Sequence, residues 1–300
     1  FLSQTHLGRQ DTRRNKHPLY ETMTSFVEKL DKESLDYFSA VCKKPFSEQA
    51  VAFLNAYWPE VHQEAEFIFT VAWEMMKYAD MQAKGVHYLY QYEEGSDLDF
   101  DIGLYFYEQL CKFLDEPKNA HWKNDFPMSQ PEMMTAIKRK QELREKVDVN
   151  FDGRVSFLEY LLHQYRAVAN PADFCKRSMT AGDEHPEIVK ARMALEEVNK
   201  RIRAYEAEKA RLTEESQQPG VKGLRAKNLL AQLDSSPLAE ELNKALITAE
   251  AAVRIATRKF GGQKGAGAAT GEAGAPLTDG AIWWMNRDLQ EKQTKYGKKK

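Results

Sequence analysis

DVNFDGRVSFLE, residues 148–159, determines the architecture that we expect for this chain. Oxygen-bearing side chains stand at positions 1, 3, 5, 9 and 12 of the stretch, a glycine stands at position 6, and position 7 can offer its carbonyl. This is the spacing of an EF-hand loop, which surrounds calcium with oxygen ligands. The expected ligands to a Ca²⁺ cofactor are Asp148, Asn150, Asp152, the Arg154 carbonyl, Ser156 directly or through water, and bidentate Glu159.

An EF-hand usually has a partner hand, and the acidic segment at about residues 93–104 is the candidate. With Phe100 aligned to the strand position of the loop, Glu93 takes the first ligand position. Leu98 then stands where glycine is needed, and Leu104 where the bidentate glutamate is needed. We expect a degenerate hand that supports the competent loop without binding metal. A solvated acidic loop is the alternative.

The remaining pattern favours an all-α fold, because apolar residues recur at spacings of three and four with little strand-like alternation. The segment from Trp58 to Gly85 is typical of a core helix that ends at a glycine cap. Ser129 and Glu132 form a capping-box pattern, which predicts a helix to about Val147. Asn170-Pro171 predicts another helix start.

Residues 185–260 have a coiled-coil character. The seam from Ile188 to Leu212 alternates spacings of three and four, and a second seam follows Ser236-Pro237 and is rich in alanine. Such seams need a partner helix, so we predict an antiparallel coiled-coil-like helical hairpin.

The expected domains follow from these patterns. They are a disordered segment 1–19, a multi-helix EF-hand domain 20–180, the hairpin 185–260, a Gly/Ala-rich linker 261–280 and a basic tail 281–300. The tail contains Trp283 and Trp284, and adjacent tryptophans are seldom left in water. We favour a clasp on the protein's own body over a second binding contact for this tail.

Composition limits the function. The three cysteines are scattered without a CxxC pair, which argues against a disulfide framework or a zinc site. Catalytic motifs are missing, so we do not expect an enzyme. Basic clusters are interleaved with glutamate, which argues against nucleic acid. Without an apolar run of bilayer length we expect no membrane span and a cytoplasmic location.

Charge is distributed unevenly along the chain. Residues 20–130 hold 20 acidic against 9 basic side chains, and residues 219–300 hold 14 basic against 8 acidic ones. Opposite charges of this kind predict either packing of the two halves on each other, self-association, or binding of the basic half to an acidic polymer.

Several long segments resemble the calcium-regulated actin-bundling protein family. They are QAVAFLNAYWPEV (49–61), DLDFDIGLYFYEQLCKF (97–113), KRKQELREKVDVNFDGRVSFLEYLL (138–162), HPEIVKARMALEEVNKRIRAYEAEKARLTEES (185–216) and GAIWWMNRDLQEK (280–292). The resemblance implies a cytoskeletal protein that cross-links actin filaments and releases them when calcium rises. It implies a stronger filament contact in the helical region after the EF-hand.

Our own candidates for that contact are basic residues of the hairpin, because the filament is acidic. They are Lys200, Arg201, Arg203, Lys209, Arg211, Lys222, Arg225 and Lys227. We expect calcium to act by changing the angle between the helices that flank its loop. The alternative function is a calcium sensor that grips a non-actin protein target.

Overall fold

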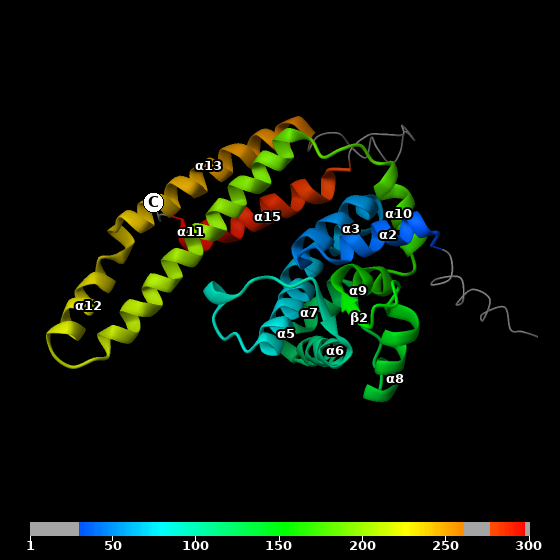
Figure 1. Cartoon of the computed structure of the whole chain (residues 1–300), viewed down its shortest axis with the longest axis horizontal. Helices are drawn as coiled ribbons and strands as arrows, with labels where there is room; N and C mark the ends of the chain where they lie inside the picture. The colour runs from blue at the N-terminus through cyan, green and yellow to red at the C-terminus, as the bar shows by residue number, and fades with distance from the viewer. Residues whose placement is uncertain (1–29, 261–276, 298–300) are drawn as a thin grey trace, which may run out of the picture.

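The computed structural model describes residues 30–260 and 277–297, so the predicted segment 1–19 and most of the predicted linker lie outside the described residues. Within those ranges the chain is almost entirely helical, with one sheet of two short strands, and the predicted all-α class is confirmed (Figure 1). No helix in the described ranges is both long and apolar enough to cross a membrane.

The helices and strands divide the described residues as follows. The helices are α2 (Lys32–Cys42), α3 (Phe46–Val61), α4 (Ala65–Phe67), α5 (Glu74–Lys84), α6 (Phe100–Asp115), α7 (Ala120–Asp125), α8 (Ala136–Glu142), α9 (Phe157–Gln164), α10 (Pro171–Thr180), α11 (Pro186–Ser216), α12 (Val221–Ala231), α13 (Pro237–Phe260) and α15 (Asp279–Tyr296). The strands are β1 (Asp97–Asp99) and β2 (Arg154–Ser156), and π-helical turns cover Ile68–Trp73 and Leu143–Val147.

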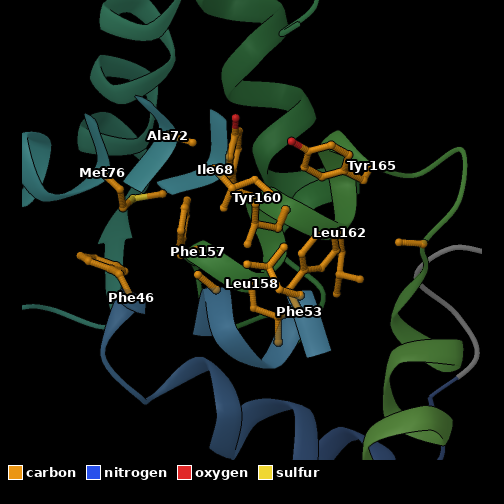
Figure 2. Packing of buried hydrophobic residues seen from close by; sticks show 14 of the residues in the cluster. Phe46, Phe53, Ile68, Ala72, Met76, Phe157, Leu158, Tyr160, Leu162 and Tyr165 are labelled. Carbon is orange, nitrogen blue, oxygen red and sulfur yellow. The ribbon is translucent and has the colours of Figure 1, made fainter. Parts of the chain in front are cut away.

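A compact body contains α2 to α10, and its centre is aromatic. Phe46 and Phe53 of α3 meet Phe157 of α9 and the nearby Tyr165 (Figure 2). All four side chains are fully buried. Burial of large aromatic surfaces dominates core energetics, so this cluster holds the loop before α9 to α3.

A second cluster lies between α11 and α13, which run side by side in opposite directions (Figure 1). Ion pairs join Glu187 to Lys259 at one end and Arg201 to Glu241 further along. Small side chains such as Ala191 and Ala249 are fully buried in the seam. They allow the two helix axes to approach closely.

Helix α15 packs against both clusters. Ile282, Met285 and Leu289 belong to the cluster between α11 and α13, whereas Trp284 belongs to the core of the body. The helix begins at Asp279, two residues before the predicted tail boundary. It therefore lies between the hairpin and α3 (Figure 1).

The helix predicted to start at Ser129 starts later in the structure, so the predicted start is wrong. Helix α8 begins at Ala136, with Thr135 as its N-cap. The Ser129 hydroxyl is buried instead, where it donates to Glu64 Oε2 at 2.5 Å and contacts the Tyr165 hydroxyl at 2.6 Å. A tertiary contact thus replaces the local cap that the pattern indicated.

Candidate metal site and its partner loop

The candidate metal site is the loop 148–159, which follows the π-helical turn Leu143–Val147 and ends in α9. Two residues turn the chain sharply, since Phe151 has φ 59° and Gly153 has φ 77°. Glycine adopts such left-handed conformations without steric cost, as expected at position 6 of a calcium loop.

Side chains at the first three ligand positions accept hydrogen bonds from the loop's own backbone. Asp148 Oδ2 accepts from the Gly153 amide at 3.0 Å, and Asn150 Oδ1 accepts from the Asp152 amide at 3.1 Å. Asp152 Oδ1 accepts from the Arg154 amide at 2.9 Å. These contacts turn the oxygens of the loop toward its interior and hold the turn in shape.

Glu159 and Ser156 are the most buried of the predicted ligands, each with 1% of its surface exposed. One carboxylate oxygen accepts from the Val149 amide at 2.9 Å, and the other accepts from the amide and hydroxyl of Ser156, each at 2.9 Å. Ser156 and Glu159 thereby form the capping box of α9. Burial raises the pKa of the Glu159 carboxyl to about 8.

Within the described residues no basic side chain forms a salt bridge with Glu159, so no ion pair offsets the burial that disfavours its charged form. A buried carboxylate that lacks a counter-charge is costly unless a cation can join it. The donors of the loop are all oxygens, which a hard divalent cation prefers. The residues present therefore fit calcium.

The three carboxylates of the loop do not yet converge. In the described part of the chain, no three His, Cys, Asp or Glu side chains are placed to hold one ion together. The reason is visible in the contacts, because Asp152 Oδ2 accepts from Asn150 Nδ2 at 2.9 Å and both Glu159 oxygens accept from the backbone. Side-chain movement is required before all ligands can meet at one point.

Strands β1 and β2 join this loop to a partner loop. Leu98 is paired with Val155, and Asp97 and Asp99 face Ser156 and Arg154. Val155 is position 8 of the calcium loop, so Leu98, and not Phe100, is position 8 of the partner. The predicted register is wrong by two residues, and the last ligand position falls on Ile102, which has no side-chain oxygen.

Two acidic side chains hold the partner loop: Asp80, which lies outside the predicted segment 93–104, and Glu94, which lies inside it but was not assigned this role. Asp80 Oδ2 accepts from the Tyr92 hydroxyl at 2.7 Å and from the Gly95 amide at 3.0 Å. Glu94 accepts from the Ser47 hydroxyl at 2.6 Å and from Trp73 Nε1 at 2.5 Å, and burial raises its pKa. Protein donors therefore satisfy these carboxylates.

Both tryptophans of α15 contact the body. Trp284 lies 4.8 Å from the Phe69 ring and 5.0 Å from the Trp73 ring, between ring centroids, and Trp283 lies 6.1 Å from Trp58. Arg287 donates three hydrogen bonds to the Glu66 carboxylate, at 2.8, 2.9 and 3.0 Å. The socket for Trp284 includes residues of the π-helical turn that precedes α5.

The eight basic residues predicted to bind a filament fall into two groups. Arg201 pairs with Glu197 and Glu241, and Arg211 pairs with Glu208 and Glu215. The other six are exposed and form no salt bridge within the described residues: Lys200, Arg203, Lys209, Lys222, Arg225 and Lys227.

The fold and the site define a helical protein that has a loop of calcium-ligand spacing in its body. Its helices α11 and α12 carry exposed basic residues that form no salt bridge within the described ranges. Over residues 154–296 the chain matches the family described as F actin bundling C terminal. It is 68% identical over 276 residues to the calcium-regulated actin-bundling protein of Dictyostelium discoideum, covering 92% of this chain and 93% of that protein.

A solved structure is also similar. The crystal structure of the 34 kDa F-actin bundling protein from Dictyostelium discoideum superposes with a TM-score of 0.83 at 65% identity, covering 91% of this chain and 100% of that chain. This chain belongs to the family of calcium-regulated actin-bundling proteins.

Proposed function

We propose that this protein cross-links actin filaments into bundles and that calcium bound in the loop 148–159 inhibits the bundling. The observation that carries the proposal is the set of six basic residues on α11 and α12 that form no salt bridge within the described residues, because the F actin bundling match covers both helices. The relatives are named as actin-bundling proteins, not as enzymes, so we assign no reaction and place the protein at the actin cytoskeleton of the cytoplasm.

Its proposed organisation has two working parts. An EF-hand domain, residues 20–180, contains the degenerate hand and the competent hand, and an antiparallel coiled-coil-like hairpin, residues 185–260, binds actin. The short β1–β2 pairing and the matching N-caps Asp99 and Ser156 support a pair of hands. Helix α15 completes the hairpin as a third helix.

Calcium would be held by Asp148, Asn150, Asp152, the Arg154 carbonyl, Ser156 and Glu159. The ion would supply positive charge to a loop whose buried carboxylate has none. Glu159 stands in the first turn of α9, so its movement toward the other ligands would also move α9. Because α9 packs on α3 through Phe157 and Phe46, the body would respond as well.

A continuous series of contacts supports coupling between this loop and the hairpin. Strand β2 pairs with β1, and the partner loop before β1 holds Trp73 through Glu94. Trp73 contacts Trp284 of α15, and Leu289 of α15 packs in the cluster between α11 and α13. A change at the calcium loop can therefore reach the filament-binding helices through packed elements.

The proposed filament contact is tested by comparing unpaired with ion-paired cations. We expect Lys200→Gln/Arg203→Gln/Lys209→Gln to weaken F-actin binding about tenfold or more at low salt, since three attractive charges are lost. The control Arg201→Gln/Arg211→Gln removes cations that are engaged within the protein. High-speed co-sedimentation measures both, and equal affinity for the triple variant and the wild type would contradict this contact.

A further inference from the structure

Helix α12 carries three of its four large apolar side chains on the solvent side, and only Leu230 packs against the cluster between α11 and α13. Val221 is 84% exposed, Leu224 is 62% exposed and Leu229 is 43% exposed, whereas the buried residues of the helix are Gly223 and Ala226. A surface helix normally buries its large apolar residues and exposes its small and polar ones. In α12 this order is reversed.

The inner face of α12 leaves no room for the helix to rotate. A Cβ atom added at Gly223 would lie 1.9 Å from the backbone oxygen of Gln218 and 3.4 Å from that of Ser216. Gly220, the residue before α12, has φ 84°, a conformation suited to glycine. Close backbone contact therefore holds Val221 and Leu224, one helical turn apart, toward solvent.

Basic residues lie on both sides of Val221 and Leu224, because at about 100° per residue Arg225 and Lys222 follow on one side of this pair and Lys227 on the other. Lys222, Arg225 and Lys227 are exposed and form no salt bridge in the described ranges. Helix α12 lies at the end of the α11–α13 pair that is remote from the body, so approaching surfaces meet it freely (Figure 1). An apolar centre with a basic rim is complementary to an apolar recess with an acidic rim.

We propose that Val221 and Leu224 form an apolar anchor that inserts into a recess on the actin filament, and that the three cations of α12 meet acidic groups around it. The F actin bundling match covers α12, and the filament is the acidic polymer that the basic rim requires. This inference rests on the proposed function, and it adds that the contact is apolar at its centre.

The test uses the full chain and the double variant Val221→Ser/Leu224→Ser. Both side chains are exposed, so folding is expected to be unaffected. The matched control is Met133→Ser/Ile137→Ser, which removes two exposed apolar residues of the body, 69% and 83% exposed. We expect the first variant to raise the dissociation constant for F-actin roughly tenfold or more, as loss of two buried apolar contacts predicts, and the control to bind like wild type.

The salt dependence of filament binding distinguishes the contribution of the apolar side chains from that of the surrounding cations. Lys222→Gln/Arg225→Gln/Lys227→Gln should weaken binding at low salt and differ little from wild type at high salt, because charge pairs are screened. Val221→Ser/Leu224→Ser should bind filaments more weakly than the wild type at both salt concentrations. If Val221→Ser/Leu224→Ser binds filaments as tightly as the wild type, the inference is overturned, while the proposed function stays intact.

Other occupants of the face give different results. If sedimentation velocity shows a wild-type dimer that Val221→Ser/Leu224→Ser converts to monomer, with filament affinity per chain unchanged, the face binds a second copy and the inference is wrong. If wild-type protein does not bind filaments at all, the proposed function fails together with the inference. If the protein is a monomer and Val221→Ser/Leu224→Ser still raises the dissociation constant for F-actin by the full expected factor, the result supports the filament anchor.

Discussion

At the residue scale, Glu159 combines two roles that compete. Its carboxylate accepts backbone hydrogen bonds that start α9, and it is the expected bidentate ligand of the loop. It is also nearly fully buried without a counter-charge. Hydrogen bonds therefore fix the Glu159 carboxylate in the loop, and a bound cation would supply the positive charge that the described basic side chains do not.

Calcium is expected to stabilise the wild type through this residue. At a free concentration of 100 times its dissociation constant, calcium should raise the free energy of unfolding by about 2.7 kcal/mol. Glu159→Gln loses bidentate charged ligation, so the same calcium concentration should leave its unfolding free energy unchanged. Urea unfolding with and without calcium measures this difference.

Glu145→Gln is the matched control for this measurement. It removes a nearby glutamate charge at an exposed position whose side chain contacts Gln141, outside the loop. Its response to calcium should equal that of the wild type. Equal calcium stabilisation of Glu159→Gln would show that the ion binds elsewhere.

Residue-level prediction from sequence is possible where a function depends on local spacing, and the calcium ligands stay a prediction of this kind. The ligand positions of the loop, from Asp148 to Glu159, follow from a fixed twelve-residue pattern. Asp80 and Glu94 could not be found in this way, because their roles depend on contacts with Gly95, Ser47 and Trp73 that the tertiary structure creates.

At the element scale, the docking of α15 depends on one close approach. A Cβ atom added at Gly280 would lie 2.6 Å from the backbone nitrogen of Asn55 and 2.6 Å from the carbonyl carbon of Leu54. Asn55 Oδ1 also accepts from the Ala281 amide at 2.8 Å. Glycine at this position lets the start of α15 rest on the backbone of α3.

Gly280→Ala is predicted to weaken the docking of α15 selectively. The methyl group meets backbone atoms that cannot move aside, so a loss of about 1–3 kcal/mol is expected. Hydrogen exchange should show faster exchange of the α15 amides, with the core of α9 little changed. Gln290→Ala, on the exposed side of the same helix, is the control and should keep wild-type protection.

The same variant tests the proposed coupling. If contacts through Trp284 carry the calcium signal, bundling by Gly280→Ala should respond less to calcium than bundling by the wild type. A variant with faster α15 exchange and full calcium sensitivity would contradict a route through α15.

Element boundaries were predictable where a cap or a breaker marks them. Gly85 ends α5 in the left-handed conformation, Pro171 opens α10 and Pro237 opens α13. The failures have a common cause. Ser129 matches a cap but is taken by a buried contact, and the register of β1 depends on its pairing with β2, which the sequence of one strand does not contain.

At the scale of the whole molecule, three helices of the C-terminal half connect a calcium-type loop to a distant tip. The body holds the loop, α15 packs on both the body and the hairpin, and α12 ends the hairpin on the far side (Figure 1). The uneven charge of the chain follows this division, because the acidic segment 20–130 contributes to the body and the free cations lie on the hairpin.

The most direct test of the account is low-speed co-sedimentation of the full chain with actin filaments, first with calcium chelated and then with saturating calcium, for the wild type and Glu159→Gln. We predict that wild-type bundles pellet without calcium and are lost with calcium, while Glu159→Gln pellets bundles in both conditions. Wild-type bundling that calcium leaves unchanged, or a Glu159→Gln variant as sensitive to calcium as the wild type, would contradict it.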